Sequence, residues 1–85
     1  MKNETIEKLY KRFILEPWDI KEVNRLKLTV AEFRAVQDNI ERIYINGFDY
    51  TYSETIANFF KSKGFKIEPY NVINYKITAP ATKTA

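Results

Sequence analysis

The side chains available for chemistry in this 85-residue chain are carboxylates, lysines, arginines and tyrosines, because the sequence contains neither Cys nor His. Without Cys there is no thiolate nucleophile, no disulfide and no zinc–sulfur site. Without His, the most common general base and transition-metal ligand is missing. Ser53 and Ser62, the two serines, therefore have no His partner with which to build a Ser-His-Asp triad.

The carboxylates do not form a recognisable catalytic or metal-binding pattern. All 11 are spread along the chain, mostly where helices begin or on exposed helical positions. None has the spacing of a calcium-binding loop, and two glycines are too few for a glycine-rich phosphate loop. We therefore expect a protein that is not an enzyme and that uses no cofactor and no metal ion.

The basic residues are distributed unevenly. The whole chain carries +3, but residues 1–60 sum to −1 and residues 61–85 sum to +4. Two interpretations are open: ordinary surface lysines that aid solubility, or a basic C-terminal face that meets an anionic partner. The longest apolar runs are too short for a membrane span or a signal peptide, so we expect neither.

Apolar periodicity predicts one small α+β domain over residues 1–78 and a flexible tail over 79–85. Three to four helices should precede a C-terminal β-hairpin. The expected N-caps are Asn3, Asp19 and Thr29, with Thr51 and Ser53 competing for the last helix. The helical ranges indicated by an i, i+3, i+4 apolar stripe are 4–15, 20–26, 30–44 and 53–63.

Two connections in this pattern carry further information. Pro17 should end the first helix, and Trp18 should pack the first two helices together at the bend. Asn46-Gly47 is consistent either with a helix end at a left-handed Gly or with a hairpin turn that joins 43–45 to 48–50. The helical period favours the first, with a short strand at 48–51 left open.

The C-terminal third predicts a helix stop that leads into a hairpin. Gly64 should adopt a left-handed conformation, with Phe65 contacting Phe60 as a Schellman motif requires. From there the apolar period changes from helical to alternating, which predicts strands on either side of a turn at about 69–71. In that pattern Ile73 belongs to the second strand.

The order helix, connection, helix, hairpin is that of a winged helix, in which the second helix reads DNA and the hairpin is the wing. Against DNA binding stand Glu54 at the start of the second helix, the absence of Arg after Arg42, and a connection longer than a helix-turn-helix turn. Helix–helix–hairpin order is also found in small folds that bind no DNA.

Aromatic residues offer a second functional signal. Nine of the chain's aromatic residues lie between positions 44 and 75. Most of the Phe residues are expected in the core, whereas Tyr50, Tyr52 and Tyr70 fall in a connection or a turn. Exposed Tyr beside Lys is typical of a protein–protein hot spot or of a platform that stacks single-stranded bases. A stacking platform would need more than two strands, which favours a protein partner.

The segment from Glu54 to Ile67, closed by Asn74-Tyr75-Lys76-Ile77, is similar to the helix–Gly–aromatic–x–aliphatic–hairpin ending of many small phage-encoded proteins. The resemblance covers about 25 residues. It implies a phage or mobile-element origin, and with it a virion-associated protein or a modulator of a host protein, located in the host cytoplasm or in a virion.

Together these signals predict an interaction protein that contacts a protein partner or a second copy of itself through an exposed hairpin edge. A winged-helix-like DNA-binding protein is the alternative. The residues expected to contact the partner are Tyr50, Tyr52, Asn58, Lys61, Lys63, Lys66, Tyr70 and Lys76. Among them, Lys61, Lys63 and Lys66 are expected to form one basic face.

Overall fold

The computed structural model describes residues 4–80 and has the predicted α+β class. In chain order its elements are α1 (Glu4–Tyr10), η1 (Lys11–Leu15), α2 (Ile20–Arg25), α3 (Val30–Asn46), β1 (Phe48–Thr51), α4 (Glu54–Ser62), β2 (Lys66–Pro69) and β3 (Tyr75–Thr78). The predicted cap at Asn3 and most of the predicted tail, residues 81–85, lie outside the described residues. Residue 79 is not part of a tail, because its N–H donates to the Gly47 carbonyl (3.1 Å) and its side chain packs against the core.

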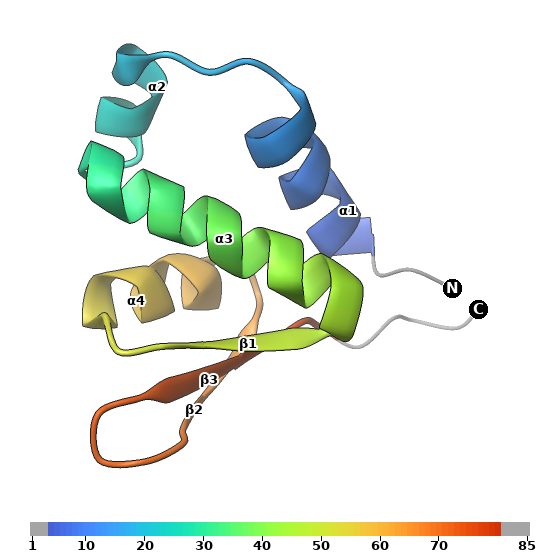
Figure 1. Ribbon diagram of the computed structural model, residues 1–85, viewed down its shortest axis with the longest axis vertical. Coiled ribbons are helices and arrows are strands. Elements are labelled where there is room, and N and C mark those ends of the chain that lie inside the picture. The colour runs from blue at the N-terminus through green and yellow to red at the C-terminus, as the bar shows by residue number, and fades with distance from the viewer. Residues whose placement is uncertain (1–3, 81–85) are drawn as a thin grey trace.

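The long helix α3 lies in the middle of the molecule. It packs against α1, η1 and α2 on one side and against β1 on the other. Figure 1 shows α3 and α4 on the same face of the sheet, with α1 and α2 beyond α3. No helix covers the opposite face of the sheet in the described part of the chain. That bare face is called the outer face below.

The predicted starts of α2, α3 and α4 are confirmed by cap hydrogen bonds. Thr29 and Glu32 form a complete capping box, since each side chain accepts from the other's backbone N–H (2.8 and 3.1 Å). Asp19 accepts from the Glu22 N–H (3.0 Å) and caps α2. Ser53, rather than Thr51, caps α4 by accepting from the Ile56 N–H (3.2 Å).

The prediction of one α-helix over 4–15 is wrong in its second part. Residues 11–15 form a π-helical turn, closed where the Glu16 N–H donates to the Lys11 carbonyl (2.9 Å). The wider turn buries Phe13 and leaves Leu15 exposed. Apolar spacing could not reveal it, because an i, i+4 stripe looks the same in an α-turn and in one π-turn.

The structure resolves the ambiguity at Asn46-Gly47. Gly47 takes a left-handed conformation (φ 90°) and its N–H donates to the Ile43 carbonyl (2.7 Å), which ends α3. The short strand left open at 48–51 then forms as β1. It pairs with β3 and not with residues 43–45, so the hairpin alternative is wrong.

The hairpin is part of a three-stranded antiparallel sheet of order β1-β3-β2. The turn predicted at about 69–71 is instead a five-residue loop at 70–74. Asn71 stabilises it, because its Oδ1 accepts from the N–H groups of Ile73 (3.0 Å) and Asn74 (2.8 Å). Ile73, expected in the second strand, therefore lies in the loop and is exposed.

The Schellman motif at the end of α4 is confirmed. Gly64 has φ 92°, the Phe65 N–H donates to the Phe60 carbonyl (3.0 Å), and the Gly64 N–H donates to the Lys61 carbonyl (3.0 Å). The rings of Phe60 and Phe65 then meet at 5.1 Å between centroids. This contact directs the chain from α4 into β2.

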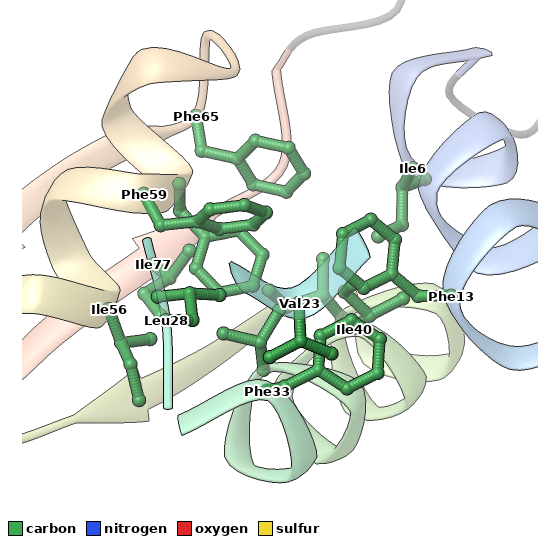
Figure 2. Close-up of a cluster of buried hydrophobic side chains, with 13 residues drawn as sticks. Ile6, Phe13, Val23, Leu28, Phe33, Ile40, Ile56, Phe59, Phe65 and Ile77 are labelled. Carbon is green, nitrogen blue, oxygen red and sulfur yellow. The ribbon is translucent and has the colours of Figure 1, made fainter. Parts of the chain in front are cut away.

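The core lies between the helices and the inner face of the sheet. Figure 2 shows side chains from α1, η1, α2, α3, α4 and β3 pointing toward one another. Phe13 stacks on Phe33 (5.3 Å between centroids) and meets Phe59 edge-on (5.8 Å). Trp18 packs on Phe33 of α3 (4.4 Å), rather than only bridging the first two helices as predicted.

One buried polar side chain fastens β1 to α3. Asn39 is 5% exposed, and its Nδ2 donates to Asp49 Oδ2 (2.6 Å) and to the Tyr50 carbonyl (3.2 Å). Arg42 approaches the same carboxylate oxygen at 3.4 Å. These bonds satisfy the inward-pointing Asp49 and one carbonyl of an edge strand.

We expect Asn39→Ala to lower the free energy of unfolding by about 2–3 kcal/mol, because it leaves Asp49 and the Tyr50 carbonyl without their buried donor. The control Arg42→Ala removes only an exposed ion pair and should cost less than about 1 kcal/mol. Urea unfolding measures both. Equal losses for the two variants would contradict a special role for Asn39.

The C-terminal end of α2 offers a second stability test. Lys27 has φ 61°, a left-handed conformation that is strained for a residue with a Cβ. We expect Lys27→Gly to raise the free energy of unfolding by about 1 kcal/mol, and the Tm by about 4–8 °C. Gly64→Ala is the reverse substitution, since it adds a Cβ at a left-handed position instead of removing one. No atom lies within 4 Å of an added Cβ there, so its expected loss of about 1 kcal/mol comes from the backbone alone. Calorimetry showing a lower Tm for Lys27→Gly would refute this account.

Candidate partner-binding surface

Strand register places six side chains on the outer face of the sheet. Asp49 and Ile77 are paired residues that point inward, toward Asn39 and the core respectively. Because successive side chains of a strand alternate between faces, their neighbours point outward. The outward set, taken from β1, β3 and β2, is Phe48, Tyr50, Lys76, Thr78, Lys66 and Glu68.

The aromatic rings on this face contact one another. Tyr50 packs on Tyr70 of the loop (4.5 Å between centroids) and meets Phe48 edge-on (5.7 Å). The Nζ of Lys76 lies 4.9 Å from the Phe48 ring centroid, a cation–π contact between diagonal neighbours of adjacent strands. The three rings therefore form a continuous aromatic surface held by β1 and the loop.

The environment of the Tyr50 hydroxyl differs from that of a free tyrosine. Partial burial raises the pKa of Tyr50 above its ordinary value of 10.0. The neighbouring Tyr70, through its charge and through a hydrogen bond to the Tyr50 hydroxyl, and the Asp49 carboxylate raise the pKa further. The Tyr50 hydroxyl accordingly stays protonated at neutral pH and keeps its hydrogen bond with Tyr70.

The loop and the end of β1 extend this surface with exposed side chains. Tyr70 is 58% exposed and Ile73 is 68% exposed, while Val72 is fully exposed. Tyr52, directly after β1, is 80% exposed. We call Phe48, Tyr50, Tyr70, Val72 and Ile73 the outer aromatic surface, with Tyr52, Lys66 and Lys76 beside it.

The structure divides the eight residues predicted from sequence into two groups. Tyr50, Tyr70, Lys66 and Lys76 lie on the outer face or its loop, and Tyr52 follows β1. Asn58, Lys61 and Lys63 belong to α4 and its C-terminal cap, and α4 packs on the other face of the sheet. The expected basic face of Lys61, Lys63 and Lys66 is therefore split between two faces of the sheet.

Three residues of the outer aromatic surface were not predicted. Phe48 lies in the segment 48–51, which the sequence left undecided between a strand and a loop. The side of the sheet to which its side chain points could therefore not be assigned. Val72 and Ile73 were assigned to a strand because of the alternating apolar pattern, although Asn71 and Asn74 on either side are typical turn residues. That pair of asparagines was the signal that could have placed both residues in the loop.

Within residues 4–80, no three His, Cys, Asp or Glu side chains are grouped to hold a metal ion. In the same range, no helix combines the length and apolar character needed to cross a bilayer. Comparison of the chain with protein-family models, curated proteins and solved structures gave no match.

We expect Tyr70→Phe to lower the pKa of Tyr50 toward its ordinary value, because it removes both the hydrogen bond and the neighbouring ionisable hydroxyl. Since the folded state holds a raised pKa, Tyr50 favours folding below about pH 10, and that contribution is lost as the pH rises above it. NMR titration of the tyrosine Cζ resonances measures the shift. Tyr52→Phe, at an exposed site, is the control. An unchanged Tyr50 titration in Tyr70→Phe would show that the two hydroxyls are not coupled.

Proposed function

We propose that this chain is a small, non-enzymatic interaction protein that binds a protein partner through the outer aromatic surface. The observation that carries the proposal is the packing of Tyr50 against Tyr70 outside the core, beside Val72 and Ile73 in the exposed loop. Solvent-accessible apolar side chains that contact one another, as Phe48, Tyr50 and Tyr70 do, are costly for a monomer and mark interaction sites. Tyrosine is enriched among the residues that dominate binding energy at such sites.

The chemistry of the partner follows from the charges around this surface. Within residues 4–80, no carboxylate lies within ion-pair distance of Lys76, whereas Lys66 is paired with Glu68 (3.8 Å). A partner that covers the rings would meet Lys76 at their border. An apolar patch with an acidic group at its border is complementary to this arrangement.

A second copy of the chain is a less favoured partner than the sequence suggested. The hairpin edge expected to pair with another copy is occupied on the β3 side by β1. The two edge strands, β1 and β2, each have a limited capacity to pair with a strand of another chain. Pro69 ends β2, and the Tyr50 carbonyl of β1 already accepts from Asn39. We therefore assign the contact to side chains of the outer face.

DNA binding through a winged helix is the alternative, and the connection between the two helices weighs against it. Strand β1 separates α3 from α4, where a helix-turn-helix would have a turn of a few residues. The exposed side of α4 offers Asn58 and Lys61, with Glu54 at its start. The phage or mobile-element origin, with a virion or host protein as the partner, stays a prediction from the C-terminal pattern.

We expect Tyr52→Ala and Ile73→Ser to weaken binding to the partner at least about tenfold, since both remove exposed contact area that the fold does not need. The same variants should change the Tm by less than about 3 °C, because exposed positions contribute little to stability. The measurements are a pull-down from the source cell with mass spectrometry, then calorimetry with the purified partner.

The matched control is Lys21→Ala, an exposed substitution on α2 and on the other side of α3 from the sheet. It should capture the same partner as the unmodified chain. Loss of several degrees of Tm in Tyr52→Ala would show that this residue serves the fold. Affinity for duplex DNA that falls steeply with salt and is lost in Lys61→Glu would favour the alternative.

A further inference from the structure

A pocket of about 360 Å³ lies between the N-terminal helices and the core, away from the outer face. Its apolar lining comes from α1, η1, the 16–19 connection, the C-cap of α2, and α3, contributed by Leu9, Phe13, Trp18, Leu26 and Phe33 respectively. Phe33 contacts both Phe13 and Trp18. Figure 2 shows Phe13 and Phe33 lying together at this end of the core.

The charged residues that line the pocket are mostly positive. Four cations line it, Lys8, Arg12, Arg25 and Lys63, together with one carboxylate, Glu22. The lining thus carries +3, which equals the net charge of the whole 85-residue chain. Residues far apart in sequence contribute, since Lys63 follows α4 whereas the other three precede α3.

The cations differ in how far other groups of the protein already neutralise them. Arg12 forms an ion pair with Glu22, lies 3.8 Å from a Glu16 carboxylate oxygen and donates to the Pro17 carbonyl (3.3 Å). By contrast, no carboxylate of residues 5–80 lies within ion-pair distance of Arg25 or Lys63. Lys63 lies over the Phe59 ring, with its Nζ 5.5 Å from the ring centroid.

We propose that this pocket binds a small organic anion that has an apolar body. Arg25 and Lys63 hold its carboxylate, sulfonate or phosphate group. Its apolar body lies against Trp18, Phe13 and Phe33. The charged group and the apolar group are both required, because the lining combines four cations with three aromatic rings.

Size favours a small molecule over a macromolecule. Ligand pockets have volumes of about 300–1,000 Å³ and are lined mostly by apolar side chains with a few polar groups that fix orientation. This pocket meets both criteria at the lower end of the range. The proposal is independent of the outer aromatic surface, since the two sites share no residue.

Trp18, the single Trp of the chain, provides the readout. The test titrates the full chain with decanoate and follows Trp18 fluorescence and its indole N–H signal in NMR spectra. Decanol and decylammonium are matched probes with a neutral and a positive head, and acetate lacks the apolar body. We expect saturable binding of decanoate, at least about tenfold tighter than that of decanol, and weaker binding as salt rises from about 20 to about 500 mM.

Variants test the charged residues. Arg25→Gln and Lys63→Gln should each weaken decanoate binding by about two- to fivefold. Lys21→Gln removes a charge from the same helix as Arg25 but outside the pocket, and should leave binding unchanged. Glu22→Gln should strengthen binding by a similar factor, because it releases Arg12 from its ion pair. The Tm of each variant shows that it is folded.

Three results would overturn the proposal. The first is decanol binding as tightly as decanoate, which would show that the pocket binds apolar molecules without using its cations. The second is equal binding by Arg25→Gln and Lys21→Gln. The third is absence of saturable decanoate binding while an acidic peptide with one Leu shifts the Trp18 signal, which would assign the pocket to a protein segment.

Discussion

The contact between Asn39 and β1 determines how the helical and β parts of this protein are joined. A short edge strand of four residues cannot stay in place by its own ladder, and its inner face carries a carboxylate. Asn39 satisfies that carboxylate and a strand carbonyl from the centre of α3. Because strand side chains alternate, fixing Asp49 inward fixes Phe48 and Tyr50 outward. The outer aromatic surface therefore depends on one buried amide.

The central position of α3 separates two surfaces of different chemistry. On the sheet side lies an open aromatic surface formed by β1 and the 70–74 loop. On the side of the N-terminal helices lies a cationic pocket with an aromatic lining. Since Phe33 of α3 lines the pocket while Asn39, further along the same helix, holds β1, both surfaces are built on one rigid element. Two ligands could bind at once without steric conflict.

The positively charged residues are grouped differently in the folded protein than along the sequence. By sequence the excess of positive charge belongs to residues 61–85, and Lys61, Lys63 and Lys66 were expected to share one basic face. Folding assigns Lys66 to the outer face, beside Glu68, and brings Lys63 to Arg12 and Arg25 at the pocket. Charges within a Debye length act together whatever their separation in sequence. The cationic site therefore could not be found from counts along the chain.

Sequence alone determined the features that depend on local chemistry. Thr29 with Glu32, Asp19 and Gly64 mark helix ends because caps and left-handed residues act within a few positions. The absence of Cys and His likewise restricts the available chemistry without any structure.

Tertiary structure decided where long-range pairing was required. Whether 48–51 became a strand depended on β3, about 25 residues later in the chain, and on Asn39. The position of Ile73 depended on a loop closed by Asn71, against its own β propensity. Each site combines residues from several elements, so only the packing of those elements could bring Tyr50 to Tyr70 and place Lys63 and Arg25 in the lining of one pocket.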